Sequence, residues 1–81
     1  MAFKGEGYEV ILASPSEYEE LVAEIYLDGR FIALLHMEKG ENLMELELAN
    51  DEVDQSMVCR KVDLKGFLDV LEVARERLRN P

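Results

Sequence analysis

The residues best suited to nucleophilic chemistry are His36 and Cys59, the only histidine and the only cysteine of the chain. A cysteine nucleophile needs a nearby base to form its thiolate. The two residues are 23 positions apart (59 − 36), on different predicted strands, and no local catalytic signature surrounds either of them. We therefore interpret Cys59 as a half-buried strand residue and His36 as a polar residue at a strand end.

The sequence does not favour a metal site or a catalytic acid–base pair. Zinc bound within one chain would need two carboxylates besides His36 and Cys59, which is unusual for a structural site. The acidic segment Asn50–Asp54 offers oxygen ligands for Ca²⁺ or Mg²⁺, but it lacks the spacing of an EF-hand. Glu45 and Glu47 alternate along a predicted strand, where we expect solvent exposure rather than the raised pKa that a general acid needs. We predict no metal, no cofactor and no enzymatic activity.

Length and composition narrow the class of protein. The 81 residues form one small domain, residues 1–81, with 48 % apolar residues and a net charge of 9 − 18 = −9. No apolar run approaches the ~20 residues of a membrane span, and the first residues lack the apolar core of a secretory signal. The acidity argues against binding to nucleic acid or to an anionic membrane surface. We expect a cytoplasmic protein.

Strand-forming residues occur in four runs separated by turn residues. These predicted strands are Tyr8–Ala13, Leu21–Leu27, Arg30–Met37 and Leu43–Leu48. Asp28 and Gly29 join the second and third runs, and such a pair predicts a hairpin whose type I′ turn needs positive φ at both residues. Met57–Val62 is a candidate further strand.

The C-terminal segment has the period of an amphipathic helix. Asp63 is placed to cap its N-terminus, whereas Gly66 in the first turn costs about 1 kcal/mol relative to alanine. The apolar stripe consists of Leu64, Phe67, Leu68, Leu71, Ala74 and Leu78. The predicted fold class is α+β, an antiparallel sheet of four to five strands with this one helix packed on one face.

The register of the hairpin decides which side chains the helix covers. Without a bulge, Leu27 opposes Arg30 and Ile25 opposes Ile32. We expect the helix to pack on the face that lacks Glu24. This face carries Leu21, Ala23, Ile25, Leu27, Ile32 and Leu34. The second face carries Val22, Glu24, Tyr26, Phe31, Ala33, Leu35 and Met37, which is more apolar than a solvated sheet face should be.

Two alternatives to an exposed apolar second face stay open. A bulge would shift the register and redistribute these side chains, and Phe3–Tyr8 could fold back over part of the face. A disordered segment 1–7 is the other possibility for the N-terminus.

The charge is unevenly distributed along the chain. Residues 1–59 carry 3 − 14 = −11, whereas residues 60–81 carry 6 − 4 = +2. We expect the basic residues of the second part to compensate the helix dipole and to form surface ion pairs, such as Glu72 with Arg75 and Glu76 with Arg79.

Three segments resemble a layout found in small uncharacterised bacterial proteins. They read YEELVAEIYLDGRFIALL, ENLMELEL and KVDLKGFLDVLEVARERL, and together they run from about Tyr18 to Leu78. The shared residues are core and turn residues, so the resemblance implies no activity and no site residues.

The sequence therefore predicts a bacterial, non-enzymatic protein-interaction module. Its contact would centre on Tyr26, Phe31 and Leu35, with Glu24, Glu45 and Glu47 steering a basic partner from the rim. The alternatives are a structural homodimer subunit of a larger assembly, an immunity- or antitoxin-like neutraliser of a basic protein, and an enzyme whose site forms between subunits.

Overall fold

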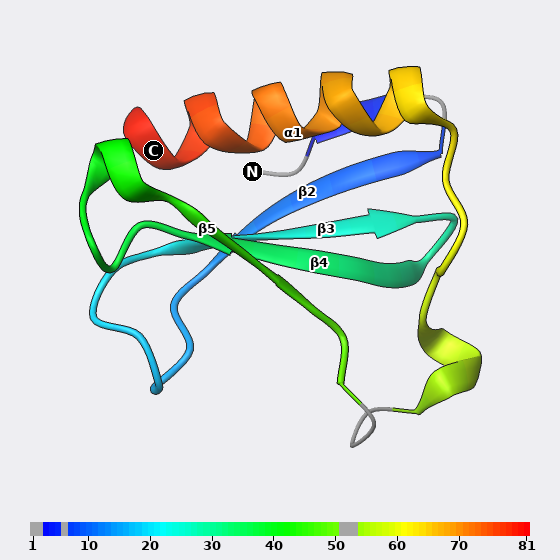
Figure 1. The fold of residues 1–81 in the computed structure, drawn as a ribbon, viewed down its shortest axis with the longest axis horizontal. Coiled ribbons are helices and arrows are strands. Elements are labelled where there is room, and N and C mark those ends of the chain that lie inside the picture. Colours follow the sequence, from blue (N-terminus) through cyan, green and yellow to red (C-terminus); the bar gives the residue numbers. More distant parts are fainter. Residues whose placement is uncertain (1–2, 6, 51–53) are drawn as a thin grey trace.

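The computed structural model describes residues 3–5, 7–50 and 54–81. Within these residues, five strands form one antiparallel sheet in the order β1-β2-β3-β4-β5, so each strand pairs with its neighbours in the chain. The strands are β1 (Phe3–Gly5), β2 (Tyr8–Ala13), β3 (Val22–Leu27), β4 (Arg30–His36) and β5 (Glu45–Leu48). Short 3₁₀ helices, η1 (Glu41–Leu43) and η2 (Gln55–Met57), flank β5, and the chain ends with the helix α1 (Leu64–Arg79). The predicted α+β class is confirmed, with α1 along one side of the sheet (Figure 1).

The β3–β4 hairpin has the predicted turn. Asp28 has φ 51° and Gly29 has φ 82°, the two positive values that a type I′ turn requires. The turn places Leu27 opposite Arg30, as predicted.

The register of this hairpin then departs from the bulge-free prediction. Ile25 opposes Ala33 instead of Ile32, because β4 carries one extra residue and forms the β-bulge noted as an alternative. Since side chains alternate along a strand, the shift places Ala33 and Leu35 on the helix side and Leu34 on the opposite side. The predicted composition of the second face is therefore wrong.

The helix α1 begins and ends as its sequence indicates. Asp63 caps it, because its Oδ2 accepts a hydrogen bond of 2.7 Å from the backbone N–H of Gly66. The helix buries Val70, Ala74 and Leu78, whereas Leu64 and Leu68 from the predicted stripe are exposed. The buried stripe is thus rotated toward Val70, and one flank of the helix keeps leucines at the surface.

Gly66 has a packing reason to be in the first turn of α1. A Cβ at this position would lie 2.8 Å from Cε2 of Tyr8 and 2.5 Å from Oδ2 of Asp63. The hydroxyl of Tyr8 donates a hydrogen bond of 2.9 Å to the other carboxylate oxygen of Asp63. Gly66 therefore lets β2 and the helix N-terminus approach closely, which offsets its poor helix propensity.

Two further predictions concern the ends of the strand region. Met57–Val62 is not a strand: η2 covers its start, and only Val58 forms a bridge, parallel to Phe31. At the N-terminus, residues 3–5 form β1 beside β2 and do not fold over the open side of the sheet. Disorder of segment 1–7, the other possibility, does not hold for residues 3–5, and residues 1, 2 and 6 lie outside the described residues.

Candidate functional site

His36, at the end of β4, lies in a cluster of carboxylates on the side of the sheet that faces away from α1. Its side chain is nearly buried, and its Nε2 is 3.0 Å from Oε2 of Glu47 and 3.4 Å from Oε1 of Glu45. Its Nδ1 accepts a hydrogen bond of 3.4 Å from the backbone N–H of Glu38, and its ring lies 5.2 Å from the ring of Tyr18. Because Nδ1 is the acceptor, the neutral imidazole carries its proton on Nε2, facing Glu47.

This cluster attaches the β2–β3 loop to the sheet. The hydroxyl of Tyr18 donates a hydrogen bond of 2.5 Å to Glu47, and this bond raises the pKa of Tyr18 to about 12. The carboxylate of Glu38 accepts hydrogen bonds from the backbone N–H groups of Glu19 and Glu20, at 2.9 and 3.0 Å. Both nitrogens of His36 are engaged by these neighbours, so the arrangement holds a loop rather than presenting a base to a substrate.

Cys59 lies far from His36. Its backbone N–H donates to the carbonyl of Phe31 at 2.8 Å, near the start of β4, whereas His36 ends that strand. His36 is five positions further along the strand than Phe31 (36 − 31), which is about 16 Å at ~3.3 Å per residue. The thiol donates to the carbonyl of Lys61 at 3.2 Å. The structure does not bring the two residues together as a Cys–His pair.

Three carboxyl groups have pKa values below their usual range, which is the opposite of what a general acid needs. Hydrogen bonds from Lys39, Ser56 and Tyr8 lower the pKa values of Glu45, Asp54 and Asp63, respectively. Over residues 3–5, 7–50 and 54–81, no group of three or more His, Cys, Asp or Glu residues is arranged to hold a metal ion. Residues 51–53 of the acidic segment lie outside the described residues.

The bulge in β4 separates the residues predicted to form the contact surface. Ala33 and Leu35 are buried in the core beneath α1, and Met37 packs against that core. A charged residue at Leu35 would therefore test the core rather than an interface. Val22 is also fully buried.

Besides the buried Val22, five of the predicted contact residues remain on the side away from α1. Tyr26 and Phe31 are half-buried and contact each other edge to face, with ring centroids 5.7 Å apart. The hydroxyl of Tyr26 donates to Glu24 at 3.1 Å, and Glu45 and Glu47 contact His36. The sheet face that was predicted to be broadly apolar is thus a mixed, largely self-contacting surface.

Several exposed apolar side chains instead lie on the helix side of the sheet. Here β5 presents Leu46 and Leu48, which oppose Leu35 and Ala33 of β4, and α1 presents Leu64 and Leu68. We call the surface between Leu46 and Leu48 on β5 and Leu68 on α1 the α1–β5 groove.

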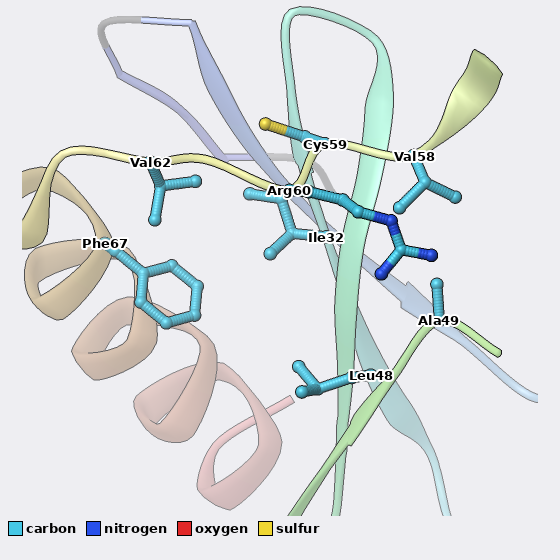
Figure 2. A pocket seen from close by; sticks show the side chains of 8 residues that line it. All are labelled: Ile32, Leu48, Ala49, Val58, Cys59, Arg60, Val62 and Phe67. Atoms are coloured by element: carbon cyan, nitrogen blue, oxygen red, sulfur yellow. The ribbon is translucent and has the colours of Figure 1, made fainter. Parts of the chain in front are cut away.

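Two hollows lie along the α1–β5 groove. One is lined by Ile32, Leu48, Ala49, Val58, Cys59, Arg60, Val62 and Phe67. Figure 2 shows Phe67 and Val62 on one side of it, Leu48 and Ala49 on the other, and Ile32 of β4 between them. The second hollow is lined by Leu35, Met44, Leu46, Leu68, Leu71, Glu72 and Arg75.

The position of α1 explains why the groove exists. The helix packs mainly on β2 and β3 and less on β4. A helix with its side chains is about 10–12 Å wide, whereas five strands spaced ~4.8 Å apart span roughly 19 Å. One helix therefore cannot cover the whole sheet, and β5 keeps its apolar side chains exposed.

The charged residues near the groove form local ion pairs. Arg75 pairs with Glu72, and Arg79 pairs with Glu41 and Glu76. The two predicted pairs on α1, Glu72 with Arg75 and Glu76 with Arg79, are confirmed.

No protein-family model, curated protein or solved structure matches this chain. The resemblance to small bacterial proteins therefore stays a prediction. In the described part of the chain, no helix is both long and apolar enough to cross a membrane.

The sequence did hold a signal for the groove that our interpretation missed. The stripe from Leu64 to Leu78 is wider than the face that a helix over two strands can bury. The alternation in Leu43–Leu48 also aligns its leucines on one side of the sheet. Both patterns supply more apolar surface than one helix can cover, on the side where the helix lies.

Proposed function

We propose that this protein is a non-enzymatic protein-interaction module that binds its partner in the α1–β5 groove. The observation that carries the proposal is that exposed leucines from β5 and from α1 line one hollow: Leu46 is 38 % exposed and Leu68 is 55 % exposed. Contiguous apolar surface of this kind usually marks an interaction site in a small domain. The proposal keeps the module predicted from the sequence and moves its contact to the other side of the sheet.

The shape of the groove favours a protein partner over a small molecule. Its two hollows have volumes of about 230 and 320 Å³, at or below the lower end of the ~300–1,000 Å³ typical of ligand pockets. Both are open along one side and lined mainly by apolar side chains, which suits the insertion of a few large apolar side chains from a partner.

The acidic residues of β5 lie on the side of this edge strand opposite to the groove. Glu45 and Glu47 lie on the edge strand, with side chains 46 % and 52 % exposed. Together with the net charge of −9, they would speed the approach of a basic partner and would make binding weaker at high salt.

Site-specific photocrosslinking in the native cell tests the proposal. A photoreactive amino acid replaces Leu68 in one variant and the neighbouring Asp69 in a control, because both side chains are exposed but only Leu68 lines the groove. We expect a protein adduct from position 68 and much less from position 69. Equal yields from the two positions, or no adduct from position 68, would contradict the proposal.

The same experiment distinguishes binding to a different protein from the alternative of a homodimer subunit. A second copy that buries Leu64 and Leu68 in its partner's groove would give an adduct of twice the mass of the chain. The mass of the purified protein would then rise with concentration in sedimentation equilibrium.

A further inference from the structure

Among residues 3–5, 7–50 and 54–81, no further strand pairs with the outer edge of β5, which lies beside the α1–β5 groove. β5 is the last strand of the sheet, and all four of its residues are exposed. An edge strand presents a row of N–H and C=O groups that can pair with another extended chain. We infer that β5 accepts an added strand from the partner, and that this strand alternates basic and apolar residues; the inference rests on the proposed function.

The alternation follows from the two sides of β5. Leu46 and Leu48 point to the helix side, where each lines one of the two hollows of the groove. Residues of an added strand alternate between the two sides of the sheet. Every second residue of that strand would therefore lie beside Leu46 and Leu48 on the helix side, which favours an apolar side chain there.

The intervening residues of the added strand would meet a row of carboxylates. Glu45 and Glu47 point to the opposite side of the sheet, where they contact His36 and remain about half exposed. Lys39 also pairs with Glu45, at 2.9 Å. Opposite charges on directly paired residues stabilise neighbouring strands, so lysine or arginine is favoured at these positions.

The same carboxylates disfavour a second copy of β5 as the added strand. Two copies related by a twofold axis perpendicular to the sheet pair antiparallel, with both helices on the same side. When Leu46 opposes itself, Glu45 opposes Glu47, and when Glu47 opposes itself, two identical carboxylates face each other. Like charges directly opposite are destabilising, so these two registers of a second copy are disfavoured relative to a strand with basic residues at the same positions.

A synthetic peptide tests this inference directly. The probe has about eight residues, an ordinary strand length, alternates lysine and valine, and has neutral ends. We expect it to shift the backbone amide signals of residues 45–48 in NMR spectra and to slow their hydrogen exchange. A peptide that alternates glutamate and valine should bind far more weakly, and this comparison uses the unaltered protein.

Charge variants locate the contact. The double variant E45Q/E47Q should weaken binding of the lysine–valine peptide about three- to tenfold, because two favourable cross-strand pairs are lost. The control E9Q/E24Q removes the same charge from the same side of the inner strands β2 and β3 and should change binding much less. An equal loss in both variants would mean general charge attraction and would overturn the inference.

A third peptide separates this inference from the proposed function. It has the same composition, rearranged so that its apolar residues follow the period of a helix. If it binds beside Leu68 without protecting the amides of β5, strand addition is wrong although the groove is a binding surface. If the lysine–valine peptide leaves β5 unperturbed, strand addition is also wrong, and crosslinking at position 68 still decides the proposed function.

Discussion

The two halves of the sheet carry similar side chains on the helix side but differ in what covers them. On β2 and β3, Val10, Ala23 and Ile25 are almost completely buried beneath α1. On β5, Leu46 and Leu48 point to the same side and remain exposed. Apolar residues at the same spacing thus form a core in one half and a surface in the other, and the position of a single helix makes the difference.

Truncation of core and groove leucines should show the largest contrast. We expect Leu78→Ala, which removes a fully buried side chain, to lower the free energy of unfolding by about 2–5 kcal/mol. Leu48→Ala should change it by less than about 0.5 kcal/mol, because that side chain is mostly in water. Urea denaturation of both variants measures the two values. A comparable loss in Leu48→Ala would mean that β5 belongs to the core.

The close contact of β2 with α1 predicts a smaller loss of stability for a substitution in the half of the sheet that the helix covers. Gly66→Ala should lower the free energy of unfolding by about 1–3 kcal/mol, because its methyl group would overlap Tyr8 and Asp63. At an ordinary helical position the same change would be stabilising. Glu76→Ala, on the exposed side of α1, is the control and should change stability by less than about 0.5 kcal/mol. A gain in the melting temperature of Gly66→Ala would rule out the close approach.

Tyrosine titration probes both sides of the sheet, because Tyr18 lies on the side away from α1 and Tyr8 contacts the start of α1. The pKa of Tyr18 is raised to about 12 by its hydrogen bond to Glu47, and that of Tyr8 is raised to about 12 by burial and by Asp63. Because the folded pKa values exceed the unfolded value of 10.0, their stabilisation is fully present below pH 10 and is lost as the pH rises through 12.

The variant Tyr18→Phe isolates one of these two contributions. It should cost up to about 1 kcal/mol at neutral pH, and its difference from the unaltered protein should shrink between pH 10 and 12. Denaturation at several pH values, with phenolate absorbance to follow ionisation, makes the comparison. A difference that stays constant over this range would show that Tyr18 does not titrate as described.

The smallest effect on stability is expected in the groove wall formed by α1. Leu68→Gln keeps a good helix former at an exposed position, so the free energy of unfolding should change by less than about 0.5 kcal/mol. Its binding to the crosslinked partner should nevertheless weaken, because apolar contact area is lost. If Leu68→Gln lowered both the free energy of unfolding and the affinity for the partner, Leu68 would belong to the core. The contrast between the two halves of the sheet would then be wrong.

Features that depend on neighbouring residues were predictable from the sequence. Asp28 and Gly29 form the expected turn because their backbone preferences favour positive φ. Asp63 caps the helix because its short carboxylate reaches an N–H three residues later. Four strands and one helix follow in the same way from periodicity.

Features that depend on distant contacts required the tertiary structure. The bulge at Ile32 moved Leu35 from the predicted contact surface into the core, and no local pattern distinguishes the two registers. His36 acquired its partners Tyr18 and Glu47 from other segments of the chain.

The sequence by itself determined which segments are apolar and how each one is regular, because backbone preference and side-chain period are local properties. Only the tertiary structure decided which apolar residues became core and which became surface. That outcome depends on where α1 lies on the sheet, and α1 covers β2 and β3 while leaving β5 open. The physical reason is width, since one helix cannot span five strands.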